Sequence, residues 1–188
     1  MTGFVGNQFA FDRNGFRVFV LSGVPRREIL LGKNLSFLPL AVTLMLLAVG
    51  VFQWMYPMRP DHLAAVLLQI VPICLLFHLA GNILSILAPL TLKPGSGMPA
   101  SHQGIRTLGH MVFILLVPIP LGLTFIPLGV EALLSFMRWV ERFPVFLILN
   151  LVQTVLVFSL YRTALNRQGG LLQQNEKKIL EIVSAKGE

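Results

Sequence analysis

The sequence predicts an all-α integral membrane protein, a helical bundle with about four transmembrane helices and both termini in the cytoplasm. Hydrophobic residues make up 55% of the 188 residues, charged residues only 12%, and the mean hydropathy is +0.76. Four apolar stretches reach the ~20 residues that an α-helix needs to cross a bilayer. Lys and Arg collect in alternate segments between these stretches. A soluble domain of this length carries far more surface charge.

The expected spans divide the chain into three regions. A cytoplasmic, interfacial segment covers residues 1–34, the transmembrane domain covers 35–163, and a cytoplasmic tail helix covers 164–188. Within the domain, the spans cover about residues 35–56, 63–90, 109–130 and 143–161.

The distribution of positive charge predicts the orientation. Twelve Lys and Arg residues lie in residues 1–34, the loop between spans two and three, and the tail, whereas the other two loops hold three. The positive-inside rule therefore places both termini in the cytoplasm, which agrees with an even number of spans. The net charge of +7 then reflects contact with anionic lipid headgroups, and we expect no nucleic-acid partner.

The N-terminal segment predicts two short surface helices. The apolar run Phe16–Val24 is too short to span and suits an interfacial amphipathic helix. The Gly-Val-Pro sequence at residues 23–25 ends it, and Pro25 can open a second short helix with Arg26, Arg27 and Glu28 on its polar side. Gly32-Lys33-Asn34 then leads into the first span.

The last two spans differ in regularity. Span three holds Pro118, Pro120 and Pro127, so it is not expected to form one straight helix. Span four is uninterrupted. Residues 171–183 alternate apolar and charged positions in the manner of a surface helix with one apolar side.

Several sites for chemistry are disfavoured by the sequence. Gly32-Lys33 does not form a phosphate-binding loop, because Arg27 stands where the first Gly is needed and Asn34 replaces Ser or Thr. The four histidines are not grouped at metal-ligand spacing, so no metal site is expected. No acidic pair lies within a span, and no serine lies in the sequence pattern of a nucleophile elbow. We therefore do not expect this protein to be an enzyme.

Span two carries one polar face. His78 and Asn82 are four residues apart and share a side of the helix, with Gly81 and Ser85 beside them. Polar groups in hydrocarbon usually face protein or water. Two interpretations are open: helix packing through interhelical hydrogen bonds, or the lining of a substrate path.

The segment FDRNGFRVFVLSGVPRREILLGKN resembles the one that precedes a transmembrane helix in ABC-2-type transporter permeases. The matching positions are Asp12, Gly15, the apolar stretch 18–21, the turn 22–26 and the run 29–33. GNILSILAP (81–89) and LLQQNEKKILEIV (171–183) also resemble one branch of bacterial exporters of this type. The three motifs occur in order and cover about a quarter of the chain.

The resemblance implies a permease subunit, or its C-terminal portion, of an ATP-driven exporter in the bacterial plasma (inner) membrane. A separate ABC ATPase subunit would bind the ATP, so this chain needs no cofactor of its own. That subunit would dock on a coupling segment, whose matching residues are Val24, Pro25, Arg26, Arg27, Glu28, Ile29, Leu30, Gly32 and Lys33.

The chain is short for this family. Permeases of this type have six or more spans, so a second permease copy or a missing N-terminal half is expected as a further partner, beside membrane lipids. The alternative is a non-transporting assembly, anchoring or regulatory subunit. The sequence does not indicate the substrate.

Overall fold

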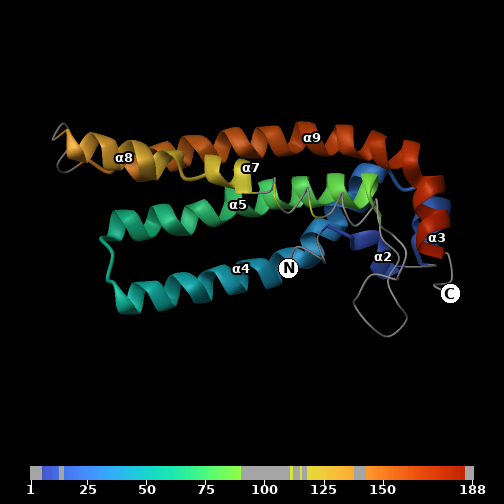
Figure 1. Ribbon diagram of the computed structural model, residues 1–188, viewed down its shortest axis with the longest axis horizontal. Coiled ribbons are helices and arrows are strands. Elements are labelled where there is room, and N and C mark those ends of the chain that lie inside the picture. The colour runs from blue at the N-terminus through green and yellow to red at the C-terminus, as the bar shows by residue number, and fades with distance from the viewer. Residues whose placement is uncertain are drawn as a thin grey trace. The chain divides into compact units, whose positions relative to one another are not determined.

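The computed structural model describes residues 6–12, 15–89, 111, 115, 118–137 and 143–184, and within these ranges it is helical with no strand. The elements, labelled in Figure 1, are α2 (Gln8–Asp12), α3 (Phe16–Leu21), α4 (Arg26–Met55), α5 (Pro60–Leu87), α7 (Pro118–Leu123), α8 (Ile126–Phe136) and α9 (Val145–Ser184).

Among the residues that the structure describes, three helices are long and apolar enough to cross a membrane: α4, α5 and the Val145–Ile182 part of α9. Their lengths are 30, 28 and 38 residues, against the ~20 that a bilayer requires. The prediction of an all-helical, membrane-embedded protein is therefore confirmed at this level.

α4 corrects the predicted boundary between residues 34 and 35. The structure has one continuous helix from Arg26 to Met55 in place of a short surface helix and a separate span. Gly32 does not interrupt it, because a single Gly lowers helix stability by only ~1 kcal/mol relative to Ala. The helix also continues through Pro39.

The segment predicted as span three is not one long helix where the structure describes it. α7 has six residues and α8 has eleven, and they are separated at Thr124 and Phe125. Pro127 near the start of α8 fits this break, since proline suits the first turn of a helix and disfavours helical structure before it. Residues 109, 110, 112–114, 116 and 117 lie outside the described residues.

α9 corrects the predicted boundary between residues 163 and 164. Span four and the tail helix form one helix of 40 residues, which runs through Gly169 and Gly170. The apolar side expected for residues 171–183 is present and packed: Leu172, Ile179 and Ile182 are buried.

The chain divides into two units, and each long helix contributes one part to each of them. Unit 1 comprises residues 1–37, 78–117 and 163–188, and unit 2 comprises 38–77 and 118–162. The apolar core of unit 1 includes Phe9, Phe16, Leu30, Ile86, Leu165, Leu172 and Ile179. That of unit 2 includes Ala65, Ile70, Cys74, Val145, Phe146, Val157 and Tyr161.

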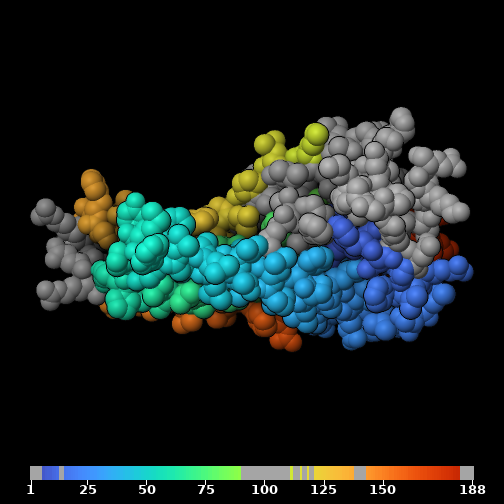
Figure 2. All heavy atoms as spheres, turned by 90° about the horizontal axis from the view of Figure 1, so that it is seen from below, coloured from blue at the N-terminus to red at the C-terminus, as the bar shows by residue number. Residues whose placement is uncertain are grey.

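α4 is the least enclosed of the long helices. Only 6% of its apolar window is buried, against 39% for α5. Figure 2 shows its side chains, in cyan and light blue, exposed along one face. Leu40, Leu47 and Val51 are more than half exposed, as expected for a helix in contact with lipid.

Candidate functional site

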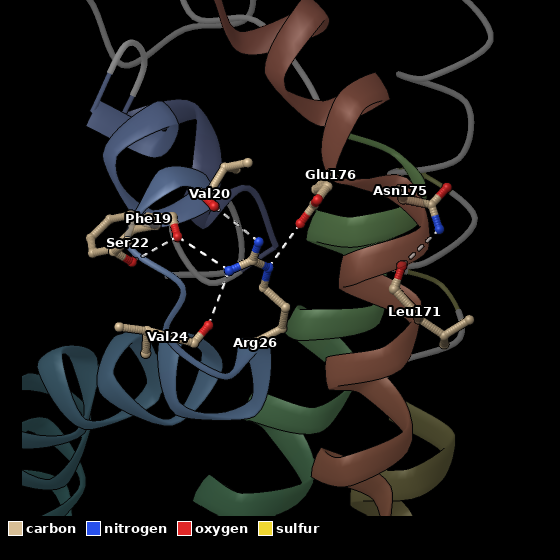
Figure 3. A network of polar contacts seen from close by, with 8 residues as sticks. All are labelled: Phe19, Val20, Ser22, Val24, Arg26, Leu171, Asn175 and Glu176. Carbon is tan, nitrogen blue, oxygen red and sulfur yellow. Dashed lines mark hydrogen bonds and ion pairs between the residues drawn. The ribbon is translucent and has the colours of Figure 1, made fainter.

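Arg26 binds three parts of unit 1 to one another (Figure 3). Its Nη1 donates to the carbonyl oxygens of Phe19 (3.2 Å) and Val24 (3.0 Å), and its Nη2 donates to that of Val20 (3.1 Å). Its Nε donates to Glu176 Oε2 on α9 at 2.8 Å. Four bonds therefore form at a guanidinium that offers five N–H donors.

The local sequence brings the side chain of Arg26, the first residue of α4, to the C-terminal end of α3. Ser22 bonds back to Val18 and Phe19, and Gly23, with φ of 67°, turns the chain where other residues are strained. The carbonyls at a helix C-terminus lack partners and carry partial negative charge. The guanidinium of Arg26 satisfies two of these carbonyls and stabilises the turn.

The bond to Glu176 connects this turn to the C-terminal part of α9. The two side chains are 14% and 19% exposed, so water screens the pair only partly. A charge-assisted hydrogen bond of this kind is stronger than a neutral one. Arg26 therefore connects α3, the start of α4 and α9.

Gly169 brings the same two helices into close contact. A Cβ placed on Gly169 would lie 2.9 Å from the backbone nitrogen of Arg27 and 3.2 Å from its Cα. Nothing lies within 4 Å of a Cβ placed on the adjacent Gly170. The backbone of α4 thus crosses α9 at a position that only glycine fits without a shift.

A buried polar cluster, defined as Gln8, Asn82, Ser85 and Gln168, joins α2, α5 and α9 within unit 1. Gln8 Nε2 donates to Asn82 Oδ1 (2.6 Å), and Asn82 Nδ2 donates to Gln168 Oε1 (3.0 Å). Gln168 Nε2 donates to the carbonyl of Leu79 (2.8 Å), and Ser85 Oγ accepts from the backbone of Gln8 (3.1 Å). All four residues are 3% exposed or less.

Lys33 ties α4 to the same cluster. It forms an ion pair with Asp12 and donates to the carbonyl of Gln8 at 3.3 Å. Its Nζ also lies 5.4 Å from the ring centroid of Phe9 and 5.6 Å from that of Phe19, within cation–π range. Lys33 therefore acts within unit 1, and its side chain is only 12% exposed.

The predicted coupling segment is divided between buried and exposed residues. Val24, Pro25, Arg27, Glu28 and Gly32 are exposed. Ile29 and Leu30, which belong to the segment that resembles the coupling segment, are 7% and 0% exposed. Ile29 and Leu30 pack inside unit 1, so the exposed surface of the segment is formed by its other residues and not by these two.

The polar face of α5 is buried in unit 1. Asn82 and Ser85 make the interhelical bonds described above, and His78 and Gly81 are buried too. These contacts fit the packing interpretation of this face, although they do not test a role in a substrate path.

The sequence did not indicate the partners of these residues. Gln8 lies in the segment predicted to be interfacial, and Gln168, Gly169 and Glu176 lie in the segment predicted to be a cytoplasmic tail helix. Their contacts connect residues 74 to 150 positions apart, and no local pattern reports such pairs. The i, i+4 polar pair on span two was the one signal that pointed to the buried polar cluster.

A second set of polar contacts lies in unit 2. Asn150 on α9 donates to the carbonyl of Ala65 (2.6 Å) and to Gln69 Oε1 (3.1 Å), and Gln69 donates to the carbonyl of Thr124. The bond from Gln69 on α5 to the carbonyl of Thr124 connects α5 to the residues between α7 and α8. It also gives a hydrogen-bond partner to a backbone carbonyl at this break.

The side chains of His62 on α5 and Glu131 on α8 lie within hydrogen-bond distance of each other. The distance from His62 Nε2 to Glu131 Oε1 is 3.1 Å, and the side chains are 32% and 11% exposed. The His62 ring also meets Phe146 edge-on, with ring centroids 5.8 Å apart. Among the described residues, no three His, Cys, Asp or Glu side chains gather as a metal site would require.

No protein-family model, curated protein or solved structure matches this chain.

Proposed function

We propose that the chain is a membrane permease subunit, or part of one, of an ABC-2-type exporter driven by a separate ATPase subunit. The observation that carries the proposal is Arg26. It lies in the segment that resembles the family's coupling segment, and it bonds that segment to α3 and to Glu176 on α9. A partner's movement at this segment would therefore reach helices that continue into the membrane.

The Gly169 contact supports the same route. Because the backbone of α4 touches α9 there without an intervening side chain, a displacement of Arg27 must displace Gly169 or separate the helices. The buried polar cluster extends the connection to α5 through bonds that are costly to break in a dry environment. In this proposal, the substrate is moved by ATP-driven rocking of the packed helices, and the contacts within unit 1 support such a coupling.

The proposed topology has four crossings and both termini in the cytoplasm. Its support is the placement of twelve of the fifteen Lys and Arg residues on one side of the expected spans. The fourth crossing would use the segment that includes α7 and α8. The bonds from Gln69 to Thr124 and from Gln153 to the carbonyl of Leu123 satisfy backbone groups that a broken helix would leave bare in lipid.

The test is the recovery of an ABC ATPase with the tagged chain from native membranes in mild detergent. Replacing residues 26–30 together would confuse docking with folding, because Arg26, Ile29 and Leu30 hold unit 1 together. Arg27→Glu changes only an exposed side chain of the same segment. Arg167→Glu, on an exposed position of α9, is the matched control with the same change of charge.

We expect Arg27→Glu to lower ATPase recovery severalfold at an unchanged melting temperature, and Arg167→Glu to leave both unchanged. Recovery of the native chain alone, with no ATPase, would instead favour an assembly, anchoring or regulatory subunit. Equal recovery with Arg27→Glu and the native chain would remove this segment as the docking site.

A further inference from the structure

Unit 2 contains a partly open cavity of about 430 Å³. Volumes of a few hundred Å³ are typical of sites for small ligands. The lining comes from α4, α5, α8 and α9, together with Met58 and Phe125 between helices. Because α4, α5 and part of α9 are long and apolar enough to cross a membrane, the ligand is expected to come from the bilayer.

The cavity is elongated along α5. His62 and Ile73 both line it, and at 1.5 Å per residue these positions are about 16 Å apart along the helix. On α4 the lining runs in parallel from Phe52 to Met45. Met45 Sδ lies 3.9 Å from the Sγ of Cys74, so the two helices are in contact beyond Ile73. A space of this shape suits one extended chain better than a compact ring system.

The described lining offers apolar surface to a ligand. Eleven of its thirteen residues are apolar, and the two polar ones, Gln69 and His62, are engaged with the protein. Gln69 donates to the carbonyl of Thr124 and accepts from Asn150. His62 Nε2 lies 3.1 Å from Glu131 Oε1. Apolar cavities exclude water and accept apolar ligands, so the part of a ligand that lies here is expected to be hydrocarbon.

The lining continues the surface that the protein presents to lipid. Phe52, Phe125 and Leu128 line the cavity and are also 62%, 55% and 43% exposed. Ala48 lines it from α4, and its neighbour Leu47 belongs to the exposed apolar face of that helix. In the hydrocarbon core of a bilayer such side chains contact acyl chains. An acyl chain can therefore pass from the bilayer into the cavity without leaving apolar surroundings.

The depth of the cavity matches one leaflet of a bilayer. His62 is two residues from the start of α5, close to the turn that follows the exposed side chains of Trp54 and Tyr56. Aromatic side chains of this kind favour the headgroup region. From His62 to Ile73 the cavity extends about 16 Å, which is about half of the ~30 Å hydrocarbon core. The acyl chain of a phospholipid covers the same depth from its headgroup.

We propose that this cavity binds one acyl chain of a bilayer phospholipid, extended along α5 from the level of His62 toward Ile73. The chain fills the space between α4 and the other helices of unit 2, and it gives α4, the least enclosed long helix, apolar contacts on that side. Recognition concerns the chain and not the headgroup. The site belongs to this protein alone, so it does not depend on a partner ATPase or on the exporter proposal.

The test uses the purified protein in nanodiscs of phosphatidylcholine, a small share of which carries a diazirine at the end of one palmitoyl chain. After illumination, mass spectrometry locates the labelled residues. Ile70 lines the cavity and is 7% exposed, whereas the next residue, Val71, lies outside the described lining and is 42% exposed. Lipid around the protein labels Val71, and only a chain inside the cavity labels Ile70. We expect both residues to be labelled.

A variant and a matched control localise the site. Ala48→Trp fills the cavity from α4 and should lower the ratio of Ile70 to Val71 labelling severalfold. Leu47→Trp places the same side chain on the exposed neighbour outside the described lining and should leave the ratio unchanged. If Ala48→Trp does not fold, a second probe decides with the native protein. A diazirine at the middle of the chain should label Val66, one turn nearer to the interface, in place of Ile70.

Three results would overturn the proposal. The first is labelling of Val71 without Ile70 in the native protein, as contact with the surrounding bilayer alone gives. The second is an unchanged labelling ratio in folded Ala48→Trp, because the label would then reach Ile70 by a route other than the cavity. The third is loss of Ile70 labelling when a small mole fraction of palmitate is added, which would assign the cavity to a free fatty acid and not to a phospholipid.

Discussion

Two adjacent glycines on α9 give the sharpest test of the packing of unit 1. Gly169→Ala would place a Cβ 2.9 Å from the backbone nitrogen of Arg27, below any ordinary contact, and 3.2 Å from its Cα. Gly170→Ala would place the same methyl group in open space. The two variants share composition, charge and helix, so their difference isolates the contact between α9 and α4.

The expected magnitudes follow from two opposing terms. Replacing a helical Gly by Ala stabilises by about 1 kcal/mol at either position. At residue 169 an overpacking cost of about 1–3 kcal/mol opposes this gain, because the atoms that must move are backbone. Gly170→Ala should therefore be slightly stabilising, and Gly169→Ala should be neutral to destabilising, with a difference of roughly 1–3 kcal/mol between them.

The assay is the apparent melting temperature in mild detergent. It is measured as the loss of monodisperse protein on size-exclusion chromatography after heating. At about 2–4 °C per kcal/mol for a chain of this size, the two variants should differ by several degrees. Equal melting temperatures for the two variants would refute the close approach of Arg27 to Gly169. A higher melting temperature for Gly169→Ala would do so as well.

The remaining predictions concern polar contacts and topology. Arg26→Ala should destabilise the protein by about 2–3 kcal/mol, because it removes four hydrogen bonds from a charged group. Arg26→Lys should recover only part of this stability, since a lysine ammonium cannot reach all four acceptors. The melting temperatures of both variants test this. Asn82→Leu should lower the stability of the protein by about 1–3 kcal/mol, because it leaves the side-chain amides of Gln8 and Gln168 without this hydrogen-bond partner. The control Asn175→Ala, on the exposed face, should change the stability by less than about 0.5 kcal/mol. Equal losses of stability in the two variants would contradict the buried polar cluster. In a background without Cys74, Arg59→Cys should react with an impermeant maleimide from outside the cell, and reaction only in inverted vesicles would reverse the proposed topology.

Much of the secondary structure could be predicted from composition and hydrophobic runs. The expected second span, 63–90, differs from α5, Pro60–Leu87, by three residues at each end. The prolines at 118, 120 and 127 correctly indicated an irregular third segment. Helix ends near water were predicted less well: surface helices expected at the start of α4 and the end of α9 proved to be continuations of the long helices. Polar residues there bind partners across unit 1, and this tertiary packing overrides local breakers such as Gly32.

The sequence by itself determined that this protein is helical and membrane-embedded, because apolar length and charge placement are properties of local segments. Only the tertiary structure decided what individual residues do. Gly169 and Gly170 are identical neighbours in the sequence, yet only Gly169 meets another backbone. Arg26 and Arg27 are likewise adjacent, yet Arg26 bonds to Glu176, 150 residues away, and Arg27 is exposed. Such differences arise from contacts between distant segments, and those exist only once the helices have packed.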